Sequence, residues 1–207
     1  MLFEKFLAIS QNSIMLKNIG ISISYLLHPM VISTLTFWFV IYQMTLTTDE
    51  PNLIFFISFF FSTLLPIVVV LYLKNQSLVS DIDVSNRKER LLPMAFGALS
   101  FLIGFVILRQ INSPMIIQGI MFCNLINTIL MWLITKHWKI SIHTLSIASA
   151  LTIFWILGFE YAIIMSLLLI LTIIARILTK AHTLSQALVG IIVGIITTYS
   201  QLILFFL

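Results

Sequence analysis

Three short segments of this otherwise apolar chain carry basic, imidazole and hydroxyl side chains. Residues 81–93 read Asp-Ile-Asp-Val-Ser-Asn-Arg-Lys-Glu-Arg-Leu-Leu-Pro, residues 139–143 read Lys-Ile-Ser-Ile-His, and residues 176–186 contain Arg176, His182 and Gln186. Guanidinium groups match phosphate oxygens in bidentate geometry. Several cations with few acids therefore predict an anion site whose natural ligand is a phosphate.

Two histidines in such a cluster could divide the steps of phosphoryl transfer. One imidazole would attack phosphorus as a nucleophile, and the other would protonate the leaving oxygen. An ordinary histidine pKa of about 6.5 suits both steps near neutral pH. The arginines can neutralise the charge on the phosphoryl oxygens, so the sequence predicts a reaction that needs no metal and no other cofactor.

The rest of the chain places these residues in a membrane protein. Of its 207 residues, 60% are hydrophobic and 9% are charged, and the mean hydropathy is +1.14. A water-soluble domain has about a quarter charged residues, which excludes an ordinary soluble protein. The single cysteine, Cys123, excludes a disulfide framework and a cysteine zinc site. The eleven Lys and Arg residues are spread over short loops, so we expect membrane lipids as partners and no nucleic acid.

Seven apolar runs predict an all-α, polytopic bundle of six to seven transmembrane helices. The runs cover residues 21–46, 52–73, 94–111, 115–135, 143–159, 161–178 and 183–207. Residues 1–20 mix charged and apolar residues without a signal-peptide core, and they predict an amphipathic segment at the membrane interface. Residues 21–207 then form one transmembrane domain. The small residues Ala187, Gly190 and Gly194 favour close helix packing within it.

The charges also predict an orientation. Alternate threading of the seven runs places the N-terminus and the three polar segments on one face. That face holds ten of the eleven Lys and Arg residues, and the opposite face holds only Arg109. The positive-inside rule assigns the richer face to the cytoplasm. We therefore expect an integral protein of the bacterial plasma membrane with its site on the cytoplasmic face.

The third polar segment resembles a motif of the type 2 phosphatidic acid phosphatase (PAP2) superfamily of membrane lipid phosphatases. The family motif is Ser-Arg, five residues, His, three residues and Asp. This chain has Arg176 after an alanine, then five residues, His182, three residues and Gln186. The spacing agrees with the family, whereas the first and last residues of the motif differ.

The other two segments are similar to the remaining PAP2 motifs and follow in the same order along the chain. The family motif Pro-Ser-Gly-His is similar to residues 140–143, which keep the serine and the histidine. The motif in which a lysine precedes Arg-Pro by seven residues is similar in kind to residues 87–93. The lysine spacing is not kept there, because the position seven before Arg90 is Asp83.

The resemblance implies a PAP2-like core and the hydrolysis of a lipid phosphomonoester or pyrophosphate. Phosphatidic acid, phosphatidylglycerol phosphate and polyprenyl pyrophosphate are the candidate substrates. The roles carried over are His182 as the nucleophile that forms a phosphohistidine, His143 as the general acid, and Arg176, Arg90, Arg87, Lys88 and Ser141 as the phosphate-binding groups.

Gln186 is the main departure from the family, since it stands where the family has the aspartate that orients the nucleophile. A neutral amide can accept the imidazole proton and hold the tautomer, but it cannot stabilise an imidazolium by charge. Asp81, Asp83 or Glu89 could supply a carboxylate from the first segment.

Other interpretations of the same residues remain open. A non-catalytic relative that binds a phosphorylated lipid would tolerate Gln186, and a membrane scaffold would need no ligand. The basic residues of segment 81–93 could instead contact anionic lipid head groups. Asp81 and Asp83 resemble the paired acids of magnesium-dependent prenyltransferases, but the second acidic cluster of those enzymes is missing. His28 and Pro29 predict a kink in the first run.

Overall fold

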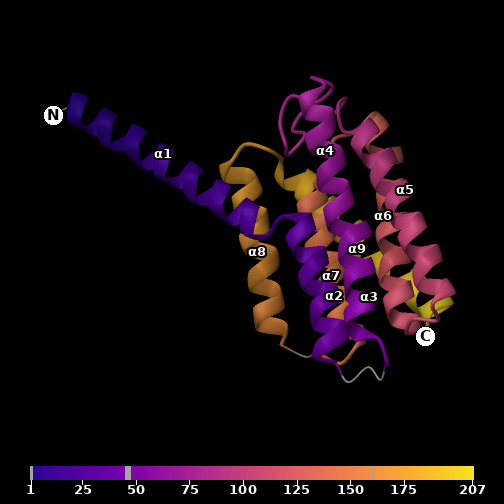
Figure 1. Cartoon of the computed structure of the whole chain (residues 1–207). Helices are drawn as coiled ribbons and strands as arrows, with labels where there is room; N and C mark the ends of the chain where they lie inside the picture. The colour runs from indigo at the N-terminus through magenta and orange to yellow at the C-terminus, as the bar shows by residue number, and fades with distance from the viewer. Residues whose placement is uncertain (1, 45–47, 160) are drawn as a thin grey trace.

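The chain folds into a bundle of α-helices with one π-helical turn (Figure 1). The computed structural model describes residues 2–44, 48–159 and 161–207, with side chains from residue 14 onward except at residue 162. The helices are α1 (Leu2–Leu26), α2 (Pro29–Tyr42), α3 (Pro51–Phe59), the π-helix η1 (Phe60–Leu64), α4 (Leu65–Asn75), α5 (Leu91–Gln110), α6 (Met115–His137), α7 (Ile142–Ile156), α8 (Ala162–Leu178) and α9 (Leu184–Phe205). These described residues contain no strand, and the all-α class is confirmed.

Among the described residues, four helical segments are long and apolar enough to cross a membrane. They are the continuous run α3–η1–α4 (Pro51–Asn75), α5, α6 and α9. The segments Ile14–Leu26 and Pro29–Tyr42 pass the same test only together, as a pair bent by 40°, and would add a fifth span. The apolar helices α7 and α8 are shorter. The protein is therefore all-helical with several candidate spans, and a total of six to seven remains a prediction.

Prolines mark the interruptions of the helices. The predicted run 21–46 is broken at His28, after which Pro29 begins α2, in agreement with the predicted kink. The π-helical turn lies directly before α4, in which Pro66 occupies the first turn. Proline has no N–H and cannot continue the regular hydrogen-bond ladder, so the helix adjusts locally around it.

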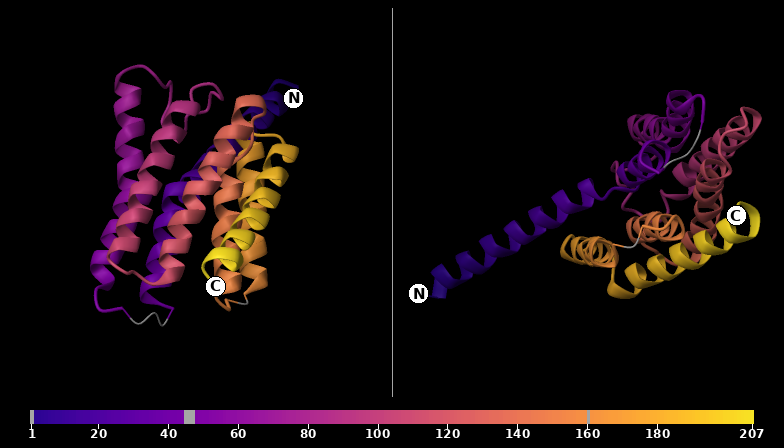
Figure 2. Two further views of the ribbon diagram at one scale, coloured as in Figure 1. Left: turned by 90° about the vertical axis from the view of Figure 1, so that its right-hand side faces the viewer. Right: turned by 90° about the horizontal axis from the view of Figure 1, so that it is seen from below.

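Helix α1 continues through the predicted boundary at residue 20 and leaves the bundle toward the N-terminus (Figures 1 and 2). It meets the bundle at Gly20, where an added Cβ would lie 3.1 Å from the Cβ of Leu178 and 3.3 Å from the carbonyl oxygen of Ala175. The amphipathic character predicted for residues 1–20 depends largely on side chains outside the described residues and stays a prediction.

The closest helix packing joins α7 to α9. Ten of the fifteen residues of α7 are buried. An added Cβ on Gly190 would lie 2.7 Å from the carbonyl oxygen of Ser141, and one on Gly194 would lie 2.7 Å from that of Leu145. Because only hydrogen fits at these two positions, the predicted role of the glycines in helix packing is confirmed.

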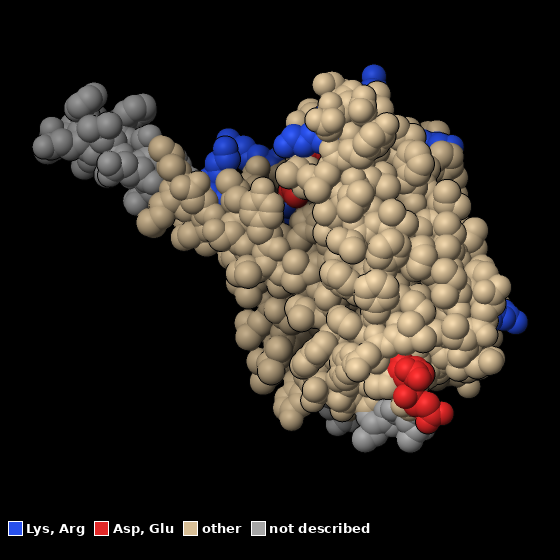
Figure 3. Space-filling view, viewed as in Figure 1, with Lys and Arg blue, Asp and Glu red and all other residues tan. Residues whose placement is uncertain are grey.

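The α4–α5, α6–α7 and α8–α9 connections and the α1–α2 break all lie at one end of the bundle (Figures 1 and 2). Lys and Arg side chains gather mainly at this end, while the acidic side chains most visible in Figure 3 lie at the opposite end. The fold thus brings the three polar segments to a common depth, as the alternating threading predicts.

Candidate functional site

Six polar side chains from different elements meet where these connections converge. We call them the polar cluster: His28 from the α1–α2 break, Asp83 and Arg90 from the α4–α5 connection, His143 from α7, Arg176 from α8 and His182 from the α8–α9 turn. Four of them, Arg90, His143, Arg176 and His182, are at most 6% exposed. Buried charge in such an apolar bundle is costly, which makes the cluster the candidate functional site.

His182 is held by a residue of its own sequence segment. Helix α8 ends at Leu178, Lys180 adopts a left-handed conformation (φ 55°), and the backbone N–H of His182 donates to the carbonyl oxygen of Arg176 over 3.2 Å. Thr183 and Gln186 then form a capping box that begins α9. The local sequence therefore turns the chain so that His182 and Gln186 face each other.

The contact with Gln186 fixes which imidazole nitrogen of His182 is free. Nδ1 lies 3.0 Å from Oε1 of Gln186, which also accepts the backbone N–H of Thr183 over 3.3 Å. An amide oxygen only accepts, so Nδ1 of His182 donates its proton and Nε2 keeps a lone pair. Burial, reinforced by the cation Arg90, lowers the pKa of His182 to about 3. The imidazole is consequently neutral at physiological pH, which a nucleophile requires.

His143 lies in the first turn of α7 beside Arg176. Its Nε2 is 3.5 Å from Nη1 of Arg176. A guanidinium can only donate, so Nε2 of His143 is the acceptor and the neutral ring carries its proton on Nδ1. Nε of Arg176 is buried and has no hydrogen-bond partner among the described residues. An unpaired guanidinium N–H in a buried site can donate a hydrogen bond to an anion.

Arg90 joins two of the connections that build the cluster. Its Nε donates to the carbonyl oxygen of Val84 over 2.7 Å, and Nη1 donates to that of Ile140 over 3.3 Å. Burial and the neighbouring Arg176 lower the pKa of Arg90 to about 10, so the side chain stays charged at neutral pH. Lys139 lies half-buried at the edge of the cluster, and burial together with Arg90 lowers the pKa of its ammonium group.

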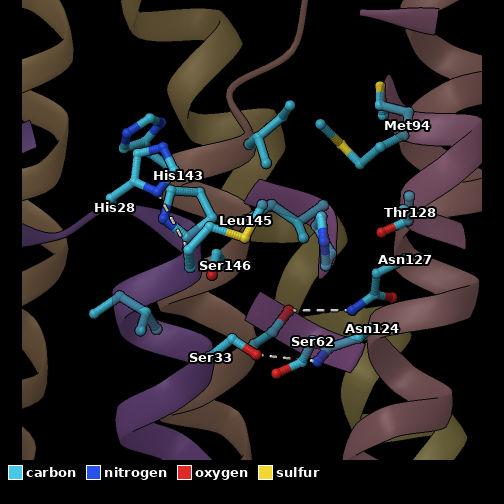
Figure 4. Close-up of a pocket in the computed structure, with 18 of the residues that line it drawn as sticks. His28, Ser33, Ser62, Met94, Asn124, Asn127, Thr128, His143, Leu145 and Ser146 are labelled. Carbon is cyan, nitrogen blue, oxygen red and sulfur yellow. Dashed lines mark hydrogen bonds between the residues drawn. The ribbon is translucent and has the colours of Figure 1, made fainter. Parts of the chain in front are cut away.

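Asp83 and His28 complete the cluster, and the sequence assigned neither of them a definite role there. The carboxylate of Asp83 lies 3.7 Å from Nη1 of Arg176 and 3.7 Å from Nε2 of His28. The rings of His28 and His143 meet edge to face, with centroids 5.2 Å apart (Figure 4). A histidine directly before the proline of a kink was the only sequence signal for His28.

His28, Asp83 and His143 also form a group whose ligand atoms lie within 4.8 Å of one another, which raises the question of a metal ion. Nδ1 of His28 accepts the backbone N–H of Met30 as the N-cap of α2, so its Nε2 carries the proton and offers no lone pair. Nε2 of His143 faces the guanidinium of Arg176. These residues fit a metal poorly, because one ligand atom is protonated and Arg176 already supplies the positive charge.

Three residues predicted to bind phosphate lie away from the cluster or have other partners. Nη1 of Arg87 donates to the carbonyl oxygens of Thr135 and Lys136, over 3.0 and 2.8 Å, at the end of α6. Lys88 is exposed. The hydroxyl of Ser141 is fully buried and caps α7 by accepting the N–H of Thr144. The arrangement therefore does not support a direct phosphate contact for these three.

The carboxylates offered as substitutes for the family aspartate do not reach His182 either. Asp81 accepts the backbone N–H of Ser85, and Glu89 accepts the N–H and hydroxyl of Ser80 over 2.6 and 2.8 Å. These bonds lower the pKa of Glu89. Asp83 faces Arg176 and His28, so Gln186 alone orients His182 among the described residues.

A cavity of about 200 Å³ extends from the polar cluster into the bundle (Figure 4). His28, Asp83, Arg90, His143 and His182 line it, and apolar residues of α2 and α5–α7 continue the wall. Amide and hydroxyl groups lie deeper: Asn124 donates to Ser33 over 3.3 Å and Asn127 donates to Ser149 over 3.2 Å. The cluster therefore opens onto a largely apolar interior.

No protein-family model, no curated protein and no solved structure matches the chain. The functional assignment therefore depends on the cluster's own chemistry. The buried guanidinium of Arg90 and the neutral imidazole of His182, with its free Nε2, line the cavity, and the guanidinium of Arg176 lies behind His143. This arrangement is suited to a phosphate group.

Proposed function

We propose that the protein is a metal-independent membrane lipid phosphatase of the PAP2 type, with a PAP2-like core. It would hydrolyse a lipid phosphomonoester or pyrophosphate through a phosphohistidine. The observation that carries the proposal is the neutral imidazole of His182, oriented by Gln186 and facing the same cavity as Arg90 and His143.

The proposed reaction has two steps. Nε2 of His182 attacks phosphorus, the bond from phosphorus to the leaving oxygen breaks, and the protonated form of His143 gives that oxygen a proton and becomes neutral. Water then attacks the phosphohistidine, His143 takes a proton from the water, and the nitrogen–phosphorus bond breaks to release phosphate. Arg90 and Arg176 would stabilise the charge that develops on the phosphoryl oxygens.

The cavity supports a substrate with a hydrocarbon part. It runs from the charged cluster between apolar residues such as Met94, Phe101 and Ile120. A phosphate bound at the cluster would leave its alcohol portion directed into this interior. Phosphatidic acid, phosphatidylglycerol phosphate and polyprenyl pyrophosphate all combine these two chemistries.

A second candidate is a non-catalytic protein that binds a phosphorylated lipid. The observation in its favour is Gln186, because an amide cannot stabilise the charge on His182 as a carboxylate would. This protein would keep the affinity for lipid phosphates without turning them over.

The test is phosphate release by the purified protein in mixed micelles, over a panel of lipid phosphates and without added metal. We expect release by the wild type, and its loss in His182→Ala. The matched control is His137→Ala, because His137 is an exposed histidine outside the cluster. A folded protein that binds the lipids without releasing phosphate would favour the binding function, and one that neither binds nor releases would favour a scaffold.

A second variant tests the lipid part of the proposal. Gly97 lines the cavity, and an added Cβ there would contact only Phe101, at 3.9 Å. Gly97→Leu would therefore fill the cavity without a backbone clash. We expect it to reduce turnover of long-chain lipids much more than turnover of a short, water-soluble phosphate ester. Ala95→Leu, on the exposed side of the same helix, is the control, and equal effects of both variants would contradict a lipid portion in the cavity.

We further propose six to seven membrane spans in the bacterial plasma membrane, with the cluster on the cytoplasmic face. The support is the excess of Lys and Arg at that end of the bundle. Maleimide labelling of Ser85→Cys tests this, since Ser85 is exposed and the native Cys123 is buried. Labelling only after permeabilisation supports the orientation, and labelling in intact cells contradicts it.

A further inference from the structure

Asp83 lies between two partners that come from opposite sides of the cluster. One carboxylate oxygen is 3.7 Å from Nη1 of Arg176 on α8, and the other is 3.7 Å from Nε2 of His28 at the α1–α2 break. The ring nitrogens of His28 and His143 and the carboxylate of Asp83 lie within 4.8 Å of one another. The carboxylate thus lies close to His143 although 60 residues separate the two in sequence.

His28 is itself fixed, which fixes the side of its ring that faces Asp83. Nδ1 accepts the backbone N–H of Met30 over 3.3 Å at the start of α2, and Nε2–H consequently points to the carboxylate. Both Asp83 and His28 are partly buried, with 26% and 23% of their side chains exposed. Limited exposure weakens solvent screening, so the charge of Asp83 acts on its neighbours more strongly than a surface charge would.

The proposed reaction demands a proton on His143, and most of the surroundings oppose it. His143 faces Arg176 from α8, Arg90 from the start of α5, His28 from the α1–α2 break and His182 from the α8–α9 turn. Two of these groups are cations, and an imidazolium beside them in a buried site is unfavourable. Asp83 places a carboxylate oxygen within 4.8 Å of a ring nitrogen of His143, and this negative charge opposes the effect of the cations.

We propose that Asp83, held by His28 and Arg176, is a positioning residue whose charge favours the protonated form of His143 that acts as general acid. The proposal rests on the proposed phosphatase function. It assigns to Asp83 a different task from the carboxylate that the sequence sought for His182, because the charge supports the acid rather than the nucleophile.

The test compares the pH–rate profiles of the wild type and Asp83→Asn, which keeps the shape and removes the charge. His143 must be protonated to act, so activity falls on the alkaline side as it loses its proton. Without Asp83 this alkaline limb should move to lower pH by about one unit. KM should stay the same or fall, because a negative charge beside the substrate phosphate is removed, whereas general structural damage would raise KM and leave the limb in place.

Two further variants separate the contacts. His28→Asn can still cap α2, since asparagine is a good N-cap, but it cannot reach Asp83, and we expect a smaller shift in the same direction. Asp81→Asn removes a carboxylate of the same loop whose partner is Ser85, and the limb should remain at its wild-type pH.

The titration of His143 can also be followed without turnover, by NMR of the nitrogen-15-labelled protein in nanodiscs. Its midpoint should move to lower pH in Asp83→Asn by the same amount. An unchanged midpoint, or superimposable pH–rate profiles, would overturn the proposal. Loss of wild-type activity in EDTA with recovery in zinc or manganese would also overturn it, in favour of a metal at His28, Asp83 and His143. Failure of the phosphatase function is distinguishable, because it appears as silence of the wild type itself on the lipid panel.

Discussion

The two buried histidines of the polar cluster are held in opposite ways. His182 has a neutral partner, Gln186, only four residues away, and the contact is a single 3.0 Å hydrogen bond. His143 lies among charged groups from α8 and the α4–α5 connection, with Arg176 at 3.5 Å and the Asp83 carboxylate beyond it. We call His182 with Gln186 the neutral side of the cluster, and His143 with Asp83, Arg90 and Arg176 the charged side.

The difference agrees with the two proposed tasks. A nucleophile needs a free lone pair and a fixed tautomer, and a neutral amide provides both without favouring protonation. A general acid needs a proton, which a nearby carboxylate favours and nearby guanidinium groups oppose. The contrast predicts that charge-changing substitutions beside His143 move the alkaline limb of the pH–rate profile and that those beside His182 move the acidic limb.

The largest effect is expected on the charged side, at Arg176. Arg176→Lys keeps a positive charge but loses the planar guanidinium, whose Nη1 lies near both His143 and Asp83 and whose Nε is an unpaired donor. We expect kcat/KM to fall by about 10²–10³-fold, as for loss of a preorganised transition-state donor. The measurement is steady-state phosphate release from the preferred lipid of the panel.

Arg87→Lys is the matched control for this comparison. Arg87 is bound to backbone carbonyls of α6, so we expect a much smaller loss of turnover. Equal losses in the two variants would contradict the assignment of Arg176, and not Arg87, to the phosphate.

An intermediate effect is expected on the neutral side, at Gln186. Gln186→Ala releases the tautomer of His182 and should lower kcat by about 10- to 100-fold, the usual cost of losing an orienting partner. Gln186→Glu should act in the opposite direction on rate, because a carboxylate stabilises the positive charge on the phosphorylated imidazole.

Gln186→Glu should also shift the pH–rate profile, and the pKa of His182 gives the direction of this shift. Burial and Arg90 lower the pKa of His182 to about 3, so the wild-type nucleophile stays neutral well below pH 6. A carboxylate at position 186 favours the imidazolium and raises this pKa, which moves the acidic limb of the profile to higher pH. An acidic limb that does not move would contradict His182 as the group that must be deprotonated.

The neutral side of the cluster was predictable from sequence because it is local. His182 and Gln186 lie four residues apart, and the turn and capping box that begin α9 bring them together. The charged side depends on contacts between distant segments. The interpretation of His28 as a kink explains its place before Pro29, but its contact with Asp83 exists only once α2 packs beside the α4–α5 connection.

Two further differences between sequence and structure have the same origin. Arg87 and Arg90 look equivalent in sequence, yet only Arg90 begins a helix at the cluster, while Arg87 reaches across to α6. Ser141 keeps the serine of the resembled motif, but its hydroxyl caps α7. The long apolar runs predicted where the helices lie, and Pro29 predicted the break at residue 28. The π-helical turn directly before α4, which contains Pro66, was not predicted.

The smallest effect is expected where the two sides are joined, at Gly190. Helix α7 carries His143, and α9 begins directly after the His182 turn, so their spacing sets the distance between the two histidines. An added Cβ on Gly190 would press on Ser141 and Thr144 at the start of α7.

Gly190→Ala should therefore lower the free energy of unfolding by about 1–3 kcal/mol, the usual cost of overpacking, and should also reduce kcat. Thermal unfolding in detergent micelles measures the stability, with Gly97→Ala as the control, because a Cβ there has room and alanine is the better helix former. Equal stability and activity of Gly190→Ala and Gly97→Ala would contradict the claim that the close packing of α7 against α9 sets the distance between His143 and His182.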